Sequence, residues 1–150
     1  MAGRRAASRA TRENLGFLLA KASQRWNELL YASFCRTGFR DIRPAHGSIL
    51  LPLFEEDGLR MGELARRSGL SKQAMTTLAR VMERRKLIAR RRDRGDARAS
   101  RVYLTPRTRR FQAVVEGILR GLDRLVESRM TRAEKAQIAS TLKKLMTLQR

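Results

Sequence analysis

The sequence predicts a mainly α-helical chain with one small β-hairpin, and three observations lead to this prediction. Large apolar residues recur at helical spacing over about 14–36, 107–130 and 132–148. Two short runs of strand-forming residues flank a stretch of turn formers at 92–100. Shorter apolar patterns between the first helix and this hairpin are separated by glycine or proline. We therefore expect long helices toward both ends of the chain, with a small helical lobe and a hairpin between them.

Length and composition exclude several classes of protein. A chain of 150 residues with 42% hydrophobic residues is long enough to bury a continuous core. It contains no apolar run of the roughly 18 residues that a bilayer-spanning helix needs, and no apolar segment typical of a signal peptide follows the basic N-terminus. We expect a soluble, cytoplasmic protein without a membrane partner.

Residue types that support catalysis or metal binding are scarce. One cysteine, Cys35, cannot form an intramolecular disulfide, and one cysteine with one histidine, His46, is too few for a zinc site. The sequence also lacks a phosphate-binding glycine loop and clustered carboxylates. We therefore expect a protein that is not an enzyme and that uses no metal and no cofactor.

The charge is strongly positive, because 34 Lys and Arg residues oppose 14 Asp and Glu residues, for a net charge of +20. Such a surplus indicates a polyanionic partner, either nucleic acid or an anionic membrane surface. A membrane-surface protein would carry its basic residues on one helix face opposite large apolar side chains; here they concentrate on the predicted hairpin, which favours nucleic acid. A GC-rich genome, which favours arginine codons, could also produce part of the surplus. The position of the charge is more informative: residues 84–101 hold nine basic and two acidic side chains. A solvated face is the alternative explanation of such a run.

The first elements follow from local signals. Residues 1–13 are dominated by Ala, Arg and Ser, so we expect a flexible basic arm. A helix from about Asn14 to Arg36 should end at Gly38. Pro44 suits the first turn of a second helix. Pro52 should kink that helix or end it early, because proline lacks the backbone donor that an interior position uses.

Residues 61–81 have the spacing of a helix-turn-helix. Two helices that cross through a tight turn need a small residue at the crossing and a glycine in the turn, and Ala65 and Gly69 supply them. Ser71 suits the N-cap of the second helix, whereas Ser68 occupies a position that often holds an apolar residue. An ordinary helical hairpin is the alternative. The predicted helices are 61–68 and 72–85, with Leu64, Leu70, Met75 and Leu78 buried between them.

The exposed side of the second of these helices suits DNA. Gln73 can bond a base edge with two hydrogen bonds, and Thr76 can offer its methyl or hydroxyl group. Lys72, Thr77 and Arg80 suit phosphates. Any one of these side chains could equally be a solvated polar residue. The predicted DNA-binding residues here are Ser71, Lys72, Gln73, Thr76, Thr77 and Arg80.

The hairpin that follows this helix has the character of a wing. Strands are expected over 87–91 and 101–104, on either side of an arginine-rich tip. Arg94 and Arg98 could enter a narrow minor groove. Asp93 is unfavourable beside phosphates unless it organises the loop, so we expect it to structure the wing by pairing with an arginine, namely Arg98.

The stretch GELARRSGLSKQAMTTLARVMERRKLIAR and the wing DRGDARASRVYLT resemble the MarR family of bacterial transcription regulators, whose wing pattern is D-x-R-D-x-R-x-x-x-V-x-L-T. The resemblance covers nearly all of Asn14–Leu148. It implies a homodimer of winged-helix lobes in the bacterial cytoplasm, associated with the nucleoid, and often a site for a small molecule or an oxidant. Three features depart from the family: Gly95 replaces the minor-groove arginine, Lys86 replaces a frequent glycine, and Pro52 interrupts the second helix.

The resemblance gives a domain plan and a function. We expect one MarR-type domain over 14–150, with a winged helix-turn-helix lobe at about 42–105 and dimerisation helices at about 14–36 and 107–148. The long apolar faces of those helices independently favour a dimer, with an intramolecular bundle as the alternative. The expected function is a sequence-specific repressor that binds a pseudo-palindromic operator in double-stranded DNA, with half-sites roughly 34–36 Å apart. The alternative is a weakly specific architectural DNA-binding protein without effector sensing.

Two features of the sequence could serve effector sensing. A pocket between the first two helices could hold a small aromatic or phenolic ligand, with His46 as its polar contact. Alternatively, the same residues form core, and the histidine is either satisfied or exposed. Cys35 could sense oxidants with help from Arg36, or it could be a structural cysteine. The predicted pocket residues are Trp26, Leu30, Phe34, His46 and Leu50.

Overall fold

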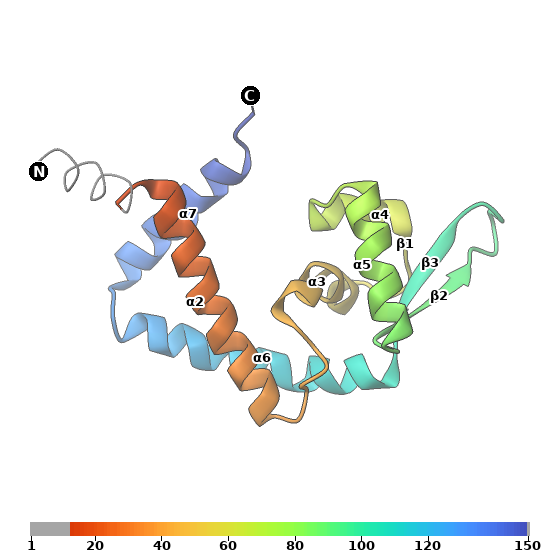
Figure 1. Cartoon of the computed structure of the whole chain (residues 1–150), viewed down its shortest axis with the longest axis horizontal. Helices are drawn as coiled ribbons and strands as arrows, with labels where there is room; N and C mark the ends of the chain where they lie inside the picture. Colours follow the sequence, from red (N-terminus) through yellow and green to blue (C-terminus); the bar gives the residue numbers. More distant parts are fainter. Residues whose placement is uncertain (1–12, 150) are drawn as a thin grey trace, which may run out of the picture. The chain divides into compact units, whose positions relative to one another are not determined.

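The computed structural model describes residues 13–149 and confirms the mainly helical fold with a β wing (Figure 1). The predicted arm at 1–13 lies outside the described residues except for its last position. The chain divides into two compact units, one ending at Val115 and the other beginning at Glu116. The elements in chain order are α2 (Leu15–Arg36), η1 (Pro44–His46), α3 (Gly47–Glu55), β1 (Leu59–Arg60), α4 (Met61–Ser68), α5 (Lys72–Arg84), β2 (Ile88–Arg92), β3 (Ser100–Leu104), α6 (Pro106–Glu127) and α7 (Arg132–Met146).

Helix α2 begins and ends where the sequence predicts. The Asn14 side chain accepts a hydrogen bond from the Phe17 N–H at 3.0 Å, which satisfies a free donor of the first turn. The helix ends at Arg36, and the Gly38 N–H donates to the Cys35 carbonyl in the turn that follows. Local capping signals therefore set both ends of this helix.

The segment around Pro44 and Pro52 differs from the single helix that was expected. A short 3-10 helix, η1, precedes α3, and Pro52 is the sixth residue of α3, which ends three residues later. Proline has no N–H to donate to the carbonyl of Ser48, one helical turn earlier. The Ser68 hydroxyl lies within hydrogen-bonding distance of that Ser48 carbonyl and 2.6 Å from the Leu64 carbonyl of its own helix, so its one proton is shared between the two acceptors. Ser68, a polar residue at a position that often holds an apolar one, therefore compensates for the N–H that Pro52 lacks.

The sheet has three antiparallel strands in the order β1-β3-β2. The hairpin of β2 and β3 was predicted; β2 is shifted by one residue from its expected bounds, and β3 begins one residue earlier than expected. Strand β1 was not predicted; it pairs Leu59 with Val102 and Arg60 with Arg101. The residue after β3 is bonded to the turn that follows α5, because the Thr105 hydroxyl donates to the Lys86 carbonyl at 2.9 Å.

The core of the first unit lies between α3, α4, α5 and the inner face of the sheet. Its apolar side chains are almost completely inaccessible to solvent, and Phe111 of α6 makes edge contacts with Phe34 and Phe39 at ring-centroid distances of 4.9 and 5.1 Å. The most buried residues here include Ile49, Leu50, Leu53, Leu64, Met75, Met82, Leu87, Ile88 and Val102. This core fixes the position of α5 relative to the hairpin.

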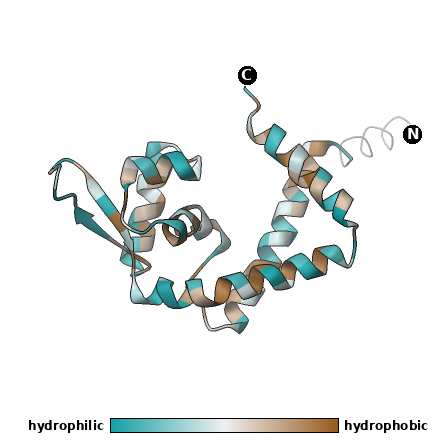
Figure 2. Ribbon diagram, turned by 180° about the vertical axis from the view of Figure 1, so that it is seen from behind, coloured by the Kyte–Doolittle hydropathy of each residue, from teal (hydrophilic) through white to brown (hydrophobic). Residues whose placement is uncertain are grey.

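The second unit contains the end of α6 and all of α7. Thr131 and Glu134 form a capping box at the start of α7. Hydrophobic residues occur along α6 in Figure 2, and α7 contains no buried residue at all. Within residues 13–149, no helix is long and apolar enough to cross a membrane.

Candidate nucleic-acid interface

Helices α4 and α5 form the helix-turn-helix that the spacing of Ala65 and Gly69 predicts. Gly69 has a φ of 64°, the left-handed conformation that glycine adopts without strain. The Leu70 N–H donates to the Ala65 carbonyl at 3.2 Å and closes the turn. The Ser71 hydroxyl accepts from the Ala74 N–H at 3.1 Å and caps α5. The turn and the cap together fix the start of α5.

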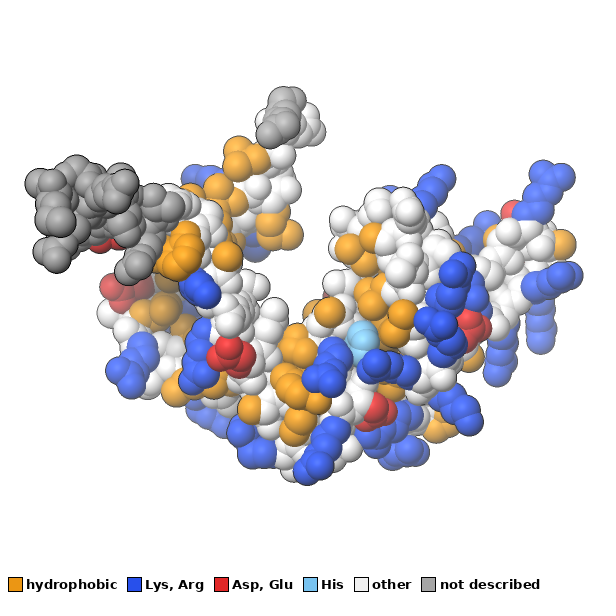
Figure 3. Space-filling model, in the orientation of Figure 1, with side chains coloured by type: hydrophobic (Ala, Val, Ile, Leu, Met, Phe, Trp, Pro, Cys, Tyr) orange, Lys and Arg blue, Asp and Glu red, His pale blue; other side chains and the backbone are white. Residues whose placement is uncertain are grey.

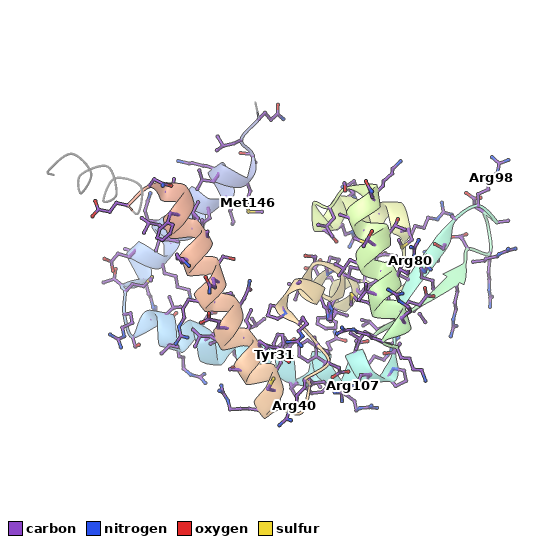
Figure 4. All side chains as sticks on the ribbon, viewed as in Figure 1. Tyr31, Arg40, Arg80, Arg98, Arg107 and Met146 are labelled. Atoms are coloured by element: carbon purple, nitrogen blue, oxygen red, sulfur yellow. The ribbon has the colours of Figure 1, made fainter. Side chains whose placement is uncertain are left out.

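Helix α5 separates a buried face from an exposed polar face. Met75, Ala79 and Met82 are buried against the lobe, whereas Leu70 and Leu78, which were expected to be buried, are half-buried. All the predicted DNA-binding side chains of this segment are exposed; Figure 4 labels Arg80 among them. They are Ser71, Lys72, Gln73, Thr76, Thr77 and Arg80.

Hydrogen bonds within α5 define which groups its threonines can offer. The Thr76 hydroxyl donates to the Lys72 carbonyl at 2.8 Å, so its proton is used inside the helix. Thr76 therefore presents its methyl group and oxygen lone pairs to a partner. Its methyl group is suited to contact a thymine methyl.

Arg84 extends the exposed face of α5, and the sequence analysis missed it. It follows Gln73, Thr77 and Arg80 at helical spacing, is exposed, and has no ion-pair partner among residues 13–149. The intervals of four, three and four residues between positions 73, 77, 80 and 84 place Arg84 on the same side of the helix, so this position could have been predicted from the sequence. The polar face of α5 thus reaches the last helical residue.

Asp93 organises the wing, but not through Arg98. Its side chain is only 4% exposed, and its Oδ2 accepts from the Nε atoms of Arg60 at 2.9 Å and Arg101 at 2.6 Å. Its Oδ1 accepts from the Gly95 N–H at 2.8 Å. The Gly95 amide and the two guanidinium groups lower the pKa of Asp93 to about 2. The expected Asp93–Arg98 pair is wrong, because β1 brings Arg60 beside Arg101 and these two arginines occupy the carboxylate.

The two predicted minor-groove residues remain exposed at the wing tip. The Arg98 backbone N–H donates to the Asp96 carboxylate at 2.9 Å, while its side chain projects from the tip (Figure 4). Neither Arg94 nor Arg98 has an acidic partner within the described part of the chain. In the space-filling view, Lys and Arg side chains project from this end of the molecule (Figure 3).

An ion pair connects the recognition-type helix to the wing. Glu83 of α5 accepts from Arg90 of β2, with a closest N–O distance of 2.6 Å. Both side chains are about one-third exposed, so the pair is partly protected from solvent screening. It joins α5 to the hairpin directly, in addition to the shared core.

The five predicted pocket residues are placed mainly in the core. Phe34, His46 and Leu50 are buried, and Trp26 and Leu30 are half-buried. The His46 Nδ1 accepts from the Arg43 N–H at 3.0 Å, so the histidine is satisfied within its own turn. Burial, with the charges of Arg85 and Arg43, lowers the pKa of His46.

An open groove between α2 and η1 has a volume of about 610 Å³, and none of those five residues lines it. Tyr31 and Arg43 lie at its wall, with the Arg43 guanidinium carbon 4.1 Å from the centre of the Tyr31 ring. The Tyr31 hydroxyl donates to the Arg40 carbonyl at 3.1 Å, and the neighbouring half-buried Cys35 thiol raises the pKa of Tyr31. The groove is a better candidate for a ligand than the residues predicted from the sequence.

Comparisons with known proteins agree with this geometry. Residues 40–99 match the MarR family. A probable transcriptional regulator from Pseudomonas aeruginosa is 22% identical with a TM-score of 0.77, over 90% of this chain and 98% of that chain. The repressor CouR, bound to a 23-mer DNA duplex, is 26% identical with a TM-score of 0.73, over 90% and 94%.

A Mycobacterium tuberculosis MarR family protein in complex with salicylic acid is 27% identical with a TM-score of 0.58, over 88% of this chain and 96% of that chain. No curated protein matches the chain.

Proposed function

We propose that the chain, whose residues 40–99 match the MarR family, is a DNA-binding transcriptional regulator of that family, and that it acts as a sequence-specific repressor that binds its operator as a homodimer. The observation that supports this best is the exposed polar face of α5, which is capped by Ser71 and anchored by buried Met75, Ala79 and Met82. A rigid helix with such a face fits the major groove.

The proposed contacts divide into those that read sequence and those that position the protein. Gln73 reads a base edge through two hydrogen bonds, and the Thr76 methyl group contacts a thymine. Lys72, Thr77 and Arg80 bind phosphates, which orient the helix without reading sequence. The Ser71 hydroxyl accepts a bond in the cap and still has its own proton to donate to a phosphate.

The wing is proposed to bind the adjacent minor groove. Arg94 and Arg98 lie exposed at its tip, and Asp93 holds the loop that presents them. Narrow A·T-rich minor grooves have an enhanced negative potential, which attracts guanidinium groups. The helix and the wing would then contact neighbouring grooves of one duplex.

The two classes of contact can be separated by substitution. The operator would first be selected from random DNA by the purified protein. We expect Arg80→Ala to weaken binding to all duplexes to a similar extent, and Gln73→Ala to reduce the preference for the operator over single-base variants by about 1–3 kcal/mol at one position. Unchanged discrimination by Gln73→Ala would contradict the base contact.

The same selection tests the architectural alternative. A protein that only shapes DNA would enrich no sequence at physiological salt, because its binding depends on phosphate contacts alone. Enrichment of a pseudo-palindrome would support the specific regulator and its two-fold symmetry.

We base the homodimer on uncovered apolar surface. Ile138, Leu142 and Met146 of α7 are exposed, as are Leu15 and Leu18 at the start of α2. Helices with such faces need a partner surface to bury them. A second copy of the chain, related by a two-fold axis, would supply it.

A small-molecule effector is proposed for the groove that contains Tyr31 and Arg43. The guanidinium and the ring offer a charge partner and a stacking surface for an aromatic carboxylate, and salicylate is the probe. Salicylate should raise the melting temperature of the wild type and release DNA. Arg43→Ala should abolish both effects, while the Arg43 backbone bond to His46 remains. No shift in either protein would contradict the site.

A further inference from the structure

The outer face of the sheet contains a row of three arginines, one from each strand. The register places Arg60 of β1 opposite Arg101 of β3, and Arg101 opposite Arg91 of β2. Residues opposed in this way lie on one face of a sheet, with strands about 4.8 Å apart. Leu59 and Val102, one position along, are buried on the other face. We call Arg60, Arg101 and Arg91 the arginine row.

Such a row is unfavourable without an anion, because like charges directly opposite one another destabilise a sheet. The structure supplies one carboxylate, Asp93, which bonds Arg60 and Arg101. Three guanidinium groups and one carboxylate leave two positive charges. Arg91 has no ion-pair partner among the described residues, and its guanidinium carbon lies 5.4 Å from the centre of the Tyr103 ring.

Asp93 holds the row in place and leaves donors free. It bonds the Nε atoms of Arg60 and Arg101, while one Nη of Arg101 donates to the Gly58 carbonyl at 2.8 Å. The remaining Nη groups of both arginines have no hydrogen-bond partner in residues 13–149. Their side chains are 48% and 40% exposed. Two guanidinium groups are thus fixed at one end and accessible at the other.

We propose that the arginine row is a phosphate-binding site at the base of the wing, which contacts the DNA backbone when α5 and the wing engage the duplex. This inference rests on the proposed DNA-binding function and adds residues outside the helix and the wing tip. Guanidinium groups bind phosphate through paired N–H donors, and preorganised ones lose little freedom on binding. The row strengthens binding to every duplex, because phosphate contacts carry no sequence information.

The salt dependence of binding tests the proposal. Affinity for a random-sequence duplex about three helical turns long is measured over a range of salt concentrations. Each lost phosphate contact lowers the slope of log affinity against log salt by about 0.9. We expect that reduction for Arg60→Gln and for Arg91→Gln, and about twice that for the double variant. Arg110→Gln, at an exposed arginine of α6 without an ion-pair partner in the described chain, should leave the slope unchanged.

Arg91→Gln separates phosphate binding from a structural role. Arg91 does not bond Asp93, so its removal leaves the bonds that shape the wing intact. Weaker binding with a wild-type slope in both single variants would overturn the proposal, and so would an equal slope change in Arg110→Gln. Arg91→Gln and Arg110→Gln should melt at the wild-type temperature, whereas Arg60→Gln also removes a bond to Asp93 and should melt at a lower one. Because the duplex has random sequence, the slopes remain informative even if the protein proves to have no operator.

Discussion

Pro52 leaves the Ser48 carbonyl without its helical donor, and the Ser68 hydroxyl of the neighbouring helix lies within hydrogen-bonding distance of that carbonyl. A partly buried carbonyl without a partner costs about 1–3 kcal/mol. The pair therefore links α3 to α4 through a side chain where the backbone cannot provide the bond.

A double-mutant cycle tests this compensation. Ser68→Ala should lower the free energy of unfolding by about 1 kcal/mol in the wild type. In a Pro52→Ala background the cost should be smaller, because the new N–H at position 52 can bond the Ser48 carbonyl. Urea denaturation of the four proteins measures the difference. Equal costs of Ser68→Ala in both backgrounds would show that the two residues act independently.

Gly95 offers a gain-of-function test at the wing. A Cβ there would lie 3.4 Å from the Asp93 Oδ1, an ordinary contact, so a side chain fits. Gly95→Arg adds the guanidinium that the MarR pattern has at this position, and we expect tighter binding to A·T-rich duplexes. Fluorescence anisotropy measures the affinity, with Gly95→Ala as the control for backbone effects. Equal affinities of the two variants would mean that the tip does not reach the groove.

Sequence patterns predicted the helices and the exposed residues of α5 because both depend on local spacing. The turn glycine, the Ser71 cap and the apolar positions of α5 are all readable within twenty residues of one another. Sequence patterns did not reveal that Asp93 is bonded by Arg60 together with Arg101. That pairing depends on Arg60, which lies 33 positions away in the chain. Only the three-stranded sheet brings these residues together.

At the scale of elements, β1 is the main omission. Two residues are too few to show an alternating pattern, so Leu59 and Arg60 could not be recognised as a strand. The strand nevertheless completes the sheet and brings a third arginine to its outer face. The candidate effector groove was missed for a similar reason, because it is formed by polar residues of α2 together with the irregular segment before α3.

The wing loop should depend on the ionisation of Asp93. Its folded-state pKa of about 2 is below the ordinary value of 3.8, so its contribution to stability is present above about pH 4 and is lost as the pH falls toward 2. The amide resonances of Gly95 and Asp96, which donate to this carboxylate, should titrate with a midpoint near 2. In Asp93→Asn this transition should be absent. A midpoint near 4 would contradict the bonding described here.

At the scale of the whole molecule, part of the net charge of +20 is accounted for by cations that lie on surfaces proposed to contact DNA. The tip, the outer face of the sheet and the exposed side of α5 all carry cations, and these three surfaces belong to one winged lobe. Charge concentrated in this way increases the rate of association with DNA at low salt. Of the remaining cations, Arg107 and Arg109 of α6 and Lys135 of α7 form ion pairs with carboxylates of the chain.

The proposed dimer predicts a specific effect of charge on α7. Leu142→Glu places a carboxylate on its apolar face and should convert a two-chain particle into a single chain in sedimentation analysis. DNA affinity should fall about 100-fold or more, because the two half-sites no longer act together. Ser140→Glu adds the same charge on the opposite side of the helix and should change neither property. A monomeric wild type would contradict the proposal.

The first turn of α6 determines where the winged lobe can be cut. Arg107 bonds Asp41 and the Gly38 carbonyl, and Arg109 bonds Asp57, whose Oδ1 accepts from the Leu104 N–H. A fragment that stopped at the end of β3 would lose these bonds, together with the contacts of Phe111. The shortest fragment suitable for isolated DNA-binding studies therefore continues to Val115.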